Sequence, residues 1–247
     1  IDLVELMIRV AAGEALSINQ QNVQHNGWAL EARVYAEDPF RNFLPSIGRL
    51  SHHRAPIETA HVRVYTGIVE GSEVSMFYDP MIAKLVTHGE NREHAIDLMI
   101  DALDSYYIRG VSHNLSFLNA LVNHPRFRAG DLTTNFIAEE YPDGFHAEDV
   151  PQVDPLLPIA IAAVVHRRHV DRNSQISGRT PRFERQIGED WVVIANSKHY
   201  PLSITSVEHG FEVSYEDAIY RIKTDWRIGD PLVVADVNGK LVTVQVD

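Results

Sequence analysis

Arg63 is a candidate catalytic or binding residue. It lies between Val62 and Val64 in the segment HVRVY, which reads as a strand. Alternation along an extended strand places the two valines on one face and Arg63 on the other. A guanidinium is permanently charged, planar and forked, so it can donate hydrogen bonds to an oxygen on which negative charge develops. An arginine on the solvent face of a strand has the same spacing. The segment therefore predicts either an oxyanion-binding arginine or a surface cation.

Two further polar patterns have a simpler interpretation. The sequence YDP at residues 78–80, followed by Lys84, leads into an apolar run. Asp-Pro in that position is typical of a turn before a strand, and we interpret it as such. Glu31 and Arg33 alternate with apolar neighbours in the segment LEARV. Opposite charges two residues apart on one strand face predict an ion pair or a contact between subdomains rather than catalysis.

The most basic stretch is 166–185, where six arginines accompany two acidic residues, a net charge of 6 − 2 = +4 in a chain of −12. One interpretation is a solvated loop, because charge runs are usually exposed. The other is a docking surface in which apolar side chains stand among arginines, a composition enriched at protein interfaces. On the second interpretation the partner-binding residues are Arg179, Arg182, Phe183 and Arg185.

Histidines number thirteen, but they show no convincing metal-binding spacing. His166 and His169 are three residues apart and could share one face of a helix, yet no third ligand accompanies them in a recognisable pattern. The chain has no cysteine, which removes disulfides, thiolate nucleophiles and cysteine-rich zinc sites. A glycine-rich phosphate loop and a serine nucleophile elbow are also missing from the sequence. The sequence therefore predicts no metal site.

The composition is that of a folded protein, since 45% of the 247 residues are hydrophobic and 23% are charged. There are 22 Lys and Arg against 34 Asp and Glu, and the resulting charge of −12 argues against general nucleic-acid binding. No apolar run approaches the ~20 residues that span a bilayer, so no membrane partner is expected. We expect both ends to be cuts through a larger polypeptide, because helical periodicity begins at once and the last strand-like run stops abruptly.

Arg63 belongs to the first part of the chain, where strands and helices alternate. Strands are predicted at 28–36, 62–65 and 81–87, between turns that proline and glycine mark. A helix is predicted from the N-cap Asn91 to a C-cap glycine at Gly110, because apolar residues recur at helical spacing between them. Further helices are expected at 1–13, 112–123 and 134–140, and the last contains Phe136.

The second part of the chain has a different period. Residues 143–157, polar and rich in proline, are the expected linker. Residues 158–170 predict a helix that is apolar on every side and therefore buried all round. Six strand-like runs at hairpin spacing follow, with Asn238-Gly239 as the strongest turn signal. We predict an α+β fold: a mixed domain at 1–142 and, at 158–247, an antiparallel β-barrel wrapped around a central helix and incomplete in this window.

Four segments stand in order along the first part: RVYAEDPFRNFLPSIGRL from residue 33, HVRVYTG from 61, FYDPMIAKLV from 77 and YIRGVSHN from 107. Together they resemble the biotin carboxylase subunit of the biotin-dependent acyl-CoA carboxylases. Four ordered motifs are far more specific than one short pattern. The resemblance covers residues 1 to about 142 and implies the C-terminal subdomain of an ATP-grasp biotin carboxylase. The second part resembles, in architecture, the domain that joins carboxylase to carboxyltransferase.

The resemblance implies ATP- and bicarbonate-dependent carboxylation of biotin. Arg63 matches the family's arginine at the ureido oxygen of biotin, where one aimed donor is typically worth ~3 kcal/mol, and is the implied catalytic residue. Phe136 matches an apolar position against the adenine of ATP. The family's ligands for Mg²⁺ or Mn²⁺ lie upstream of Ile1, and its biotinylated lysine lies in a downstream carrier domain of the same polypeptide. This window alone is therefore expected to be inactive.

The resemblance also implies a partner, because in the family the segment after the central helix contacts the carboxyltransferase beta subunit. We expect residues 173–188 to do so here. The segments LPSIGRL, SHN (112–114) and YPDGF (141–145) are most similar to alpha subunits of the propionyl-CoA type, whose product is methylmalonyl-CoA. Methylcrotonyl-, acetyl-CoA- and pyruvate-type subunits, and a non-catalytic assembly module, remain alternatives. The expected location is the cytoplasm for a bacterial protein and the mitochondrial matrix for a eukaryotic one.

Overall fold

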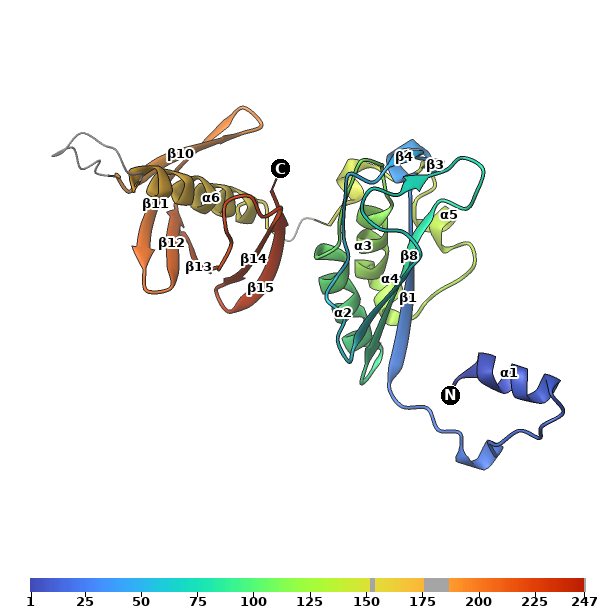
Figure 1. The fold of residues 1–247 in the computed structure, drawn as a ribbon. Coiled ribbons are helices and arrows are strands. Elements are labelled where there is room, and N and C mark those ends of the chain that lie inside the picture. The colour runs from blue at the N-terminus through green and yellow to red at the C-terminus, as the bar shows by residue number, and fades with distance from the viewer. Residues whose placement is uncertain (152–153, 176–186, 247) are drawn as a thin grey trace.

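The protein is described by a computed structural model, which covers residues 1–151, 154–175 and 187–246. In the first part, three antiparallel strands form a sheet in the order β1-β8-β6, and helix α2 packs on one of its faces (Figure 1). The bounds are β1 (Trp28–Tyr35), β6 (Val62–Thr66), β8 (Met81–Gly89) and α2 (Arg92–Asp104). The three predicted strands are thus confirmed and lie in one sheet.

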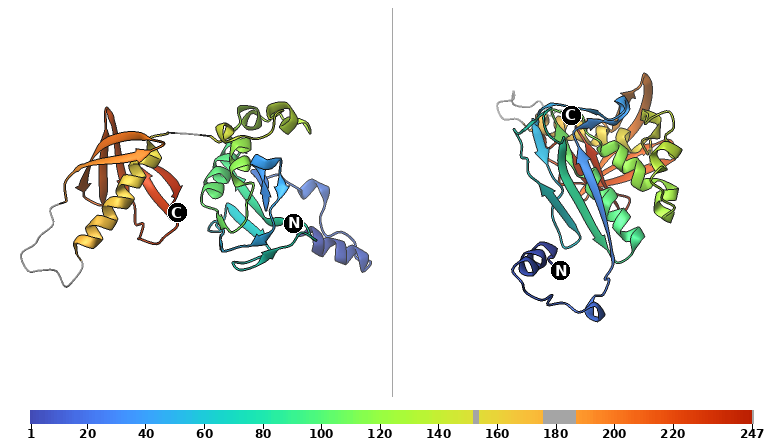
Figure 2. Two further views of the ribbon diagram at one scale, coloured as in Figure 1. Left: turned by 90° about the horizontal axis from the view of Figure 1, so that it is seen from above. Right: turned by 90° about the vertical axis from the view of Figure 1, so that its right-hand side faces the viewer.

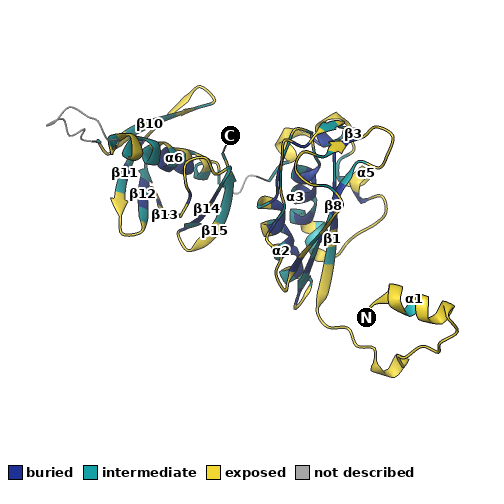
Figure 3. Ribbon diagram, viewed as in Figure 1, coloured by how far each residue is buried: buried dark blue, intermediate teal, exposed yellow. Residues whose placement is uncertain are grey.

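Short elements surround this sheet. The paired strands are β2 (Glu37–Asp38) with β3 (Leu44–Pro45), β4 (Gly48–Arg49) with β7 (Glu73–Val74), and β5 (His52–Arg54) with β9 (Tyr107–Arg109). The other helices of this part are α1 (Leu3–Ala11), α3 (Leu115–Asn123), α4 (Pro125–Ala129) and α5 (Phe136–Glu140). Helix α1 is confirmed as a helix, but none of its residues is buried (Figure 3).

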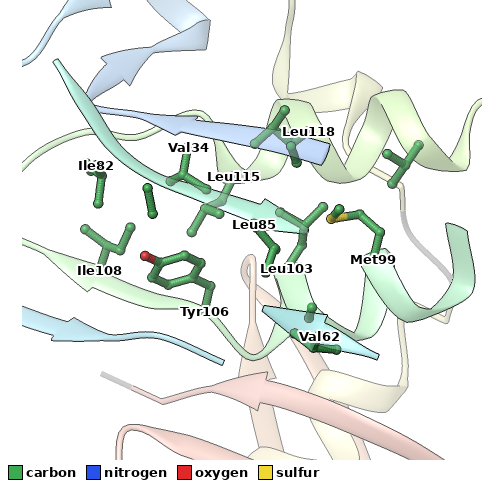
Figure 4. Close-up of a cluster of buried hydrophobic side chains, with 14 of the residues drawn as sticks. Val34, Val62, Ile82, Leu85, Met99, Leu103, Tyr106, Ile108, Leu115 and Leu118 are labelled. Carbon is green, nitrogen blue, oxygen red and sulfur yellow. The ribbon is translucent and has the colours of Figure 1, made fainter. Parts of the chain in front are cut away.

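Helix α2 is positioned by its cap and its apolar stripe. The Asn91 side chain accepts a hydrogen bond from the backbone N–H of His94 at 2.9 Å, which satisfies one free donor of the first turn. Ile96, Met99 and Leu103 are fully or almost fully buried against the sheet, where Val34 and Leu85 meet them (Figure 4). The face of the sheet that α2 covers is therefore the core of the domain.

The end of α2 differs from the prediction. The helix stops at Asp104, and residues 107–109 form strand β9, which pairs with β5. Gly110 follows that strand, so its assignment as a helix C-cap was wrong. The physical reason is tertiary: Tyr106 and Ile108 are almost fully buried in the same core, and the strand pairing outweighs the helical periodicity of the segment.

Asn114 is a buried polar brace between α3 and the end of β1. Its side chain donates to the carbonyl of Arg33 at 3.1 Å and accepts from the backbone N–H of Tyr35 at 2.9 Å. The pairing of β1 with β8 shifts register between Val34 and Tyr35, so the strand's own ladder is irregular there. The amide of Asn114 therefore replaces backbone partners that β8 does not supply.

Replacing Asn114 with alanine should lower the free energy of unfolding by about 2–4 kcal/mol, because two backbone groups would lose their partners in a nearly buried position. Urea unfolding followed by circular dichroism measures this. Asn22→Ala, at an exposed position outside the sheet, is the matched control and should change stability by less than about 0.5 kcal/mol. Equal stability of Asn114→Ala and the parent would contradict the bracing role.

Asp104, at the end of α2, has a carboxyl group whose pKa is raised by its surroundings. Loss of solvent around its carboxyl group, with repulsion from Asp101, raises its pKa to about 6, although Asn119 donates to it at 2.6 Å. Between pH 4 and pH 6 the folded chain therefore holds more protons at this site than the unfolded chain does. Stability contributed by this group is present in acid and is lost as the pH rises through about 6.

Asp104→Asn should accordingly raise the melting temperature at pH 7 and flatten its dependence on pH between pH 4 and 6. The residue as a whole is exposed, so solvent screening should keep the gain at or below ~1 kcal/mol. Thermal scans over a pH series measure it. Asp217→Asn removes the same charge from an exposed turn and should leave the slope unchanged. A lower melting temperature for Asp104→Asn at pH 7 would oppose this account.

The start of the predicted linker packs on the first domain. Phe145 is almost fully buried and makes edge-to-face contacts with Phe117 and Tyr141, at ring-centroid distances of 5.3 and 5.6 Å. Val150 packs against the same cluster. The aromatic residues of 141–145 therefore hold the end of this domain in place by apolar contact.

The second part is a curled antiparallel sheet around one helix, α6 (Leu157–Ser174), as Figure 2 shows. Ala160, Ile161, Ala163 and Val164 of α6 are buried, but Pro158, Ala162 and His166 are exposed, so the prediction of burial all round was wrong. Six strands follow in chain order: β10 (Asp190–Ala195), β11 (Lys198–Val207), β12 (Gly210–Tyr215), β13 (Ala218–Lys223), β14 (Leu232–Val237) and β15 (Lys240–Gln245). Within the described residues β10 and β15 do not pair, so the predicted α+β fold with an incomplete barrel is confirmed.

Arg168 fastens the helix to the sheet. Its guanidinium donates to the carbonyls of Trp226 at 2.9 Å and Thr224 at 2.5 Å, in the connection between β13 and β14. The same group lies over the ring of Phe211 at 5.7 Å. This arginine of the basic stretch therefore has a structural role inside the barrel.

Candidate functional site

The three-stranded sheet has two unlike faces, and only one of them is covered. Toward α2 lie Ala32, Val34, Ala83, Leu85 and Val62, all buried. The alternate residues point to the other face, where Glu31, Arg33, Arg63 and Tyr65 are exposed and Lys84 and Val86 are half-buried. We name this second surface the open face. It carries every polar side chain of the three strands that the sequence singled out.

Register places these side chains in two rows across the open face. Glu31, Val86 and Arg63 lie side by side on β1, β8 and β6. Arg33, Lys84 and Tyr65 form the next row in the same strand order. Arg63 and Lys84 are therefore diagonal neighbours on adjacent strands, a separation of roughly 7–8 Å that long side chains reach across.

Arg63 is exposed on the edge strand β6, on the face opposite its valine neighbours, as the alternation predicts. Its guanidinium forms no hydrogen bond or ion pair with any residue in the described ranges. An arginine with its hydrogen-bonding capacity free on an open surface fits an anion or the oxygen of a bound group.

Glu31 and Arg33 form the ion pair that the sequence predicted, with Arg33 Nε 3.2 Å from Glu31 Oε1. Both side chains are solvent-accessible, so the pair contributes little to stability. Its main effect is electrostatic, because it neutralises one of the cations on the open face. The Asp79 side chain accepts from the backbone N–H of Met81 at 2.8 Å at the start of β8, while the turn itself lies at residues 76–77, just before the predicted 78–80.

Phe136 begins helix α5 and is only 5% exposed. Its ring is flanked by the imidazole of His124 and the guanidinium of Arg126, each 5.2 Å away. Both neighbours are tied to Glu140, with His124 Nε2 3.0 Å from one carboxylate oxygen and Arg126 on the other. These contacts account for Phe136 as a packing residue of its own domain, and its contact with adenine stays a prediction.

The proposed docking residues Arg179, Arg182, Phe183 and Arg185 lie outside the described residues. Helix α6 ends at Ser174 before them, and β10 begins at Asp190 after them. The two helical histidines nearby are engaged by aromatic rings, His166 with Trp191 and His169 with Trp226, at centroid distances of 5.4 and 6.2 Å. These contacts indicate packing at the sheet.

In the residues that the structure describes, no three or more His, Asp or Glu side chains come together as metal ligands. The same ranges contain no helix both long and apolar enough to cross a bilayer. The described surface therefore offers Arg63 and its neighbours on the open face as the candidate site.

The sequence alone did not indicate the roles of two residues, Lys84 on the open face and Asn114, which supports strand β1. Lys84 was treated only as part of a turn-and-strand signature, because its proximity to Arg63 depends on the register between β6 and β8. Asn114 was noted only as part of the SHN motif. Its hydrogen-bond partners, Tyr35 and Arg33, precede it by 79 and 81 positions in the sequence. Single-strand alternation can indicate which face a residue takes, whereas cross-strand neighbours require the pairing itself.

Comparison with known proteins agrees with this arrangement. Residues 31–139 match the Biotin carboxylase C-terminal domain, which covers the sheet, and residues 159–247 match the Propionyl-coenzyme A carboxylase BT domain, which covers the barrel. The chain belongs to the biotin carboxylase family, with a BT domain after the carboxylase part. Among its homologues are propionyl-CoA carboxylase alpha chains.

Two such relatives span almost the whole chain. The propionyl-CoA carboxylase alpha chain of Ruegeria pomeroyi is 46% identical over an alignment of 266 residues, gaps included, which covers 100% of this chain and 39% of that protein. The mitochondrial alpha chain of Homo sapiens is 39% identical over 238 residues, covering 94% of this chain and 33% of that protein. The chain thus spans well under half the length of these relatives.

Solved structures give the same fold for the first domain. The biotin carboxylase subunit of pyruvate carboxylase matches with a TM-score of 0.56 and 37% identity, over 62% of this chain and 33% of that one. The Hydrogenobacter thermophilus 2-oxoglutarate carboxylase biotin carboxylase domain, described in complex with MgADP and bicarbonate, matches with a TM-score of 0.56 and 34% identity over 62% and 32%. The resemblance inferred from the four motifs is confirmed.

Proposed function

We propose that the chain is part of the alpha subunit of a propionyl-CoA carboxylase. In this proposal the full-length polypeptide carboxylates biotin with ATP and bicarbonate, and a carboxyltransferase beta subunit transfers the carboxyl group to propionyl-CoA, giving methylmalonyl-CoA. The observation that carries it is Arg63, an exposed guanidinium without a partner in the described residues, on the open face of a biotin carboxylase domain. Identity of 46% across the whole chain supports the subtype.

Arg63 would act by donating hydrogen bonds. Biotin, when bound, supplies the ureido nitrogen that carries the carboxyl group. The rigid fork of Arg63 suits the neighbouring ureido oxygen, because a fixed cation stabilises negative charge there without reorganising. β6 holds the arginine through its pairing with β8, and the buried Val62 and half-buried Val64 anchor the strand on the opposite face.

The remaining cofactors are assigned elsewhere in this proposal. As in the family that the motifs resemble, the ligands of Mg²⁺ or Mn²⁺ and most contacts to ATP would lie upstream of Ile1. Phe136 would contribute at most an apolar contact to the nucleotide. A biotin carrier domain of the same polypeptide would bring biotin to the open face. Bacterial and mitochondrial relatives support a cytoplasmic location in a bacterium and a matrix location in a eukaryote.

The direct test is carboxylation of free biotin by the full-length polypeptide with ATP, Mg²⁺ and bicarbonate labelled with ¹⁴C. Incorporation of label that requires ATP would support the proposal. The alternative of a non-catalytic assembly module predicts binding of the beta subunit without any labelling. Substitution of methylcrotonyl-, acetyl-CoA or pyruvate for propionyl-CoA in the coupled assay separates the other carboxylase types.

Assembly with the beta subunit provides a second test, on the segment 173–188. Reversing the charges of Arg179, Arg182 and Arg185 to glutamate should weaken association by at least about tenfold, because charged residues at an interface steer and orient docking. Biolayer interferometry against the purified beta subunit measures the change. Carboxylation of free biotin should survive in this variant, which separates docking from chemistry. Unchanged association would remove the segment from the interface.

A further inference from the structure

The two domains of the chain meet where helix α2 faces strand β15 of the barrel. Figure 1 shows these elements on the facing sides of the two domains, and Cα atoms of α2 and β15 approach within 8 Å of each other. Helix α2 packs on the buried face of the three-stranded sheet, so this α2–β15 contact lies on the side of the sheet away from the open face.

The charges on the two sides of the contact are opposite. Asp101 and Asp104 are exposed at the end of α2, and the exposed Lys240 begins β15. Burial and neighbouring acids raise the pKa of both carboxyl groups, and the ammonium of Lys240 acts on both in the opposite direction. Within the described residues that ammonium makes no direct ion pair, so its attraction to α2 acts over a longer distance and is open to screening by salt.

A direct hydrogen bond joins the same strand to the first domain. With the side-chain amide of Gln245 turned so that its oxygen faces Arg109, the guanidinium donates to that oxygen, with Nη1 at 2.9 Å. The guanidinium carbon of Arg109 also lies 5.3 Å from the centre of the Tyr107 ring. Both residues belong to β9, which is fixed by its pairing with β5. The first domain therefore presents an ordered donor to the last strand of the barrel.

The covalent connection between the domains is short. Val150 packs in the aromatic cluster of the first domain, whereas Asp154 accepts a hydrogen bond from the hydroxyl of Tyr220 in the barrel at 2.8 Å. Three residues, 151–153, separate these two anchors, and four Cα–Cα steps extend at most about 14 Å. A short connection gives joined surfaces an effective concentration on the order of millimolar, so weak polar contacts suffice to bring them together.

We propose that the α2–β15 contact is a reversible docking site that holds the barrel in one preferred orientation on the first domain. Its side chains are charged or polar, namely Asp101, Asp104 and Arg109 on one domain and Lys240 and Gln245 on the other. Small polar contacts between domains permit relative motion, whereas large apolar ones do not. The docked orientation sets the side of the first domain from which a partner of the barrel approaches. This inference does not depend on the proposed function.

The test is zero-length cross-linking of the full-length polypeptide with a carbodiimide, which joins a carboxylate to a lysine amine only where the two groups meet. Mass spectrometry of the band at monomer size should identify Lys240 linked to Asp101 or Asp104. The yield should fall by at least about threefold from about 50 mM to about 500 mM NaCl, because salt screens separated charges. Lys223 and Asp236, opposite each other within the barrel sheet, are the control pair, whose yield should change by less than half.

Two variants separate docking from chance encounters. Arg109→Met removes the direct hydrogen bond and should lower the yield of the Lys240 cross-link by at least about twofold, whereas Arg54→Met, on the paired strand β5, should leave it unchanged. Lys240→Glu combined with Asp101→Lys exchanges the charges and should restore a link between positions 101 and 240 to within twofold of the parent. Absence of any link at position 240 while the control pair reacts, or a yield indifferent to both salt and Arg109→Met, would overturn the proposal.

Discussion

Arg63→Gln in the full-length polypeptide is expected to lower kcat for biotin carboxylation by about 10²–10³-fold, the loss typical of removing one donor aimed at developing negative charge. The side chain is exposed and makes no contact that the fold requires, so the melting temperature should change little. Steady-state assays with free biotin and labelled bicarbonate measure the effect. Arg63→Lys keeps the charge but loses the planar fork, so its kcat should fall between the two.

The control for Arg63 is another exposed arginine of the same domain. Arg54 on β5 belongs to a different strand pair, so Arg54→Gln should leave kcat within twofold of the parent. The comparison separates loss of a particular guanidinium from loss of one positive charge. If Arg63→Gln retains kcat within twofold as well, the catalytic role is refuted.

Gly110→Ala is expected to destabilise the first domain by at least ~4 kcal/mol, in the range where folding itself fails. Gly110 has φ +101°, a conformation that residues with a Cβ rarely adopt. A Cβ there would overlap the backbone carbonyl oxygen of Arg49 and lie 2.7 Å from the backbone nitrogen of Ser51. Both obstacles are main-chain atoms next to the pairing of β5 with β9, so no side-chain rotation removes the overlap.

Gly144→Ala separates the two causes. Gly144 has a similar φ of +93°, but an added Cβ would meet nothing within 4 Å. This variant should therefore show only the conformational cost, about 1–2 kcal/mol. Urea unfolding, or the soluble yield where unfolding cannot be followed, compares the two. Equal losses at both positions would show that close packing around Gly110 contributes nothing.

The elements of this fold were largely predictable because each has a strong local signal. Alternation identified the strands that became β1, β6 and β8, and Asn91 marked the start of α2. The apolar run at the start of α6 likewise predicted a helix packed inside the barrel, although Pro158, Ala162 and His166 leave one side of it exposed. Alternation also placed Arg63 on the face away from the core.

The end of α2 and the composition of the site were not predictable in this way. Tyr106 fits the helical stripe of α2, but the next three residues pair with β5 and form strand β9, and this partner lies some fifty positions earlier in the chain. Lys84 joins Arg63 only through the register of two strands, and one residue of slip would turn it into the core. Information of this kind is non-local, so no window of sequence around Lys84 contains it.

The uninterrupted meander from β10 to β15 has a kinetic consequence. Each strand pairs with the one synthesised just before it, so every new pairing closes only a short loop and the topology has a low contact order. In the first domain β1 pairs instead with β8, and six short strands lie between them in the sequence. This pairing therefore closes a much longer loop. We therefore expect the barrel to form hairpin by hairpin and to reach its native state faster than the domain that carries Arg63.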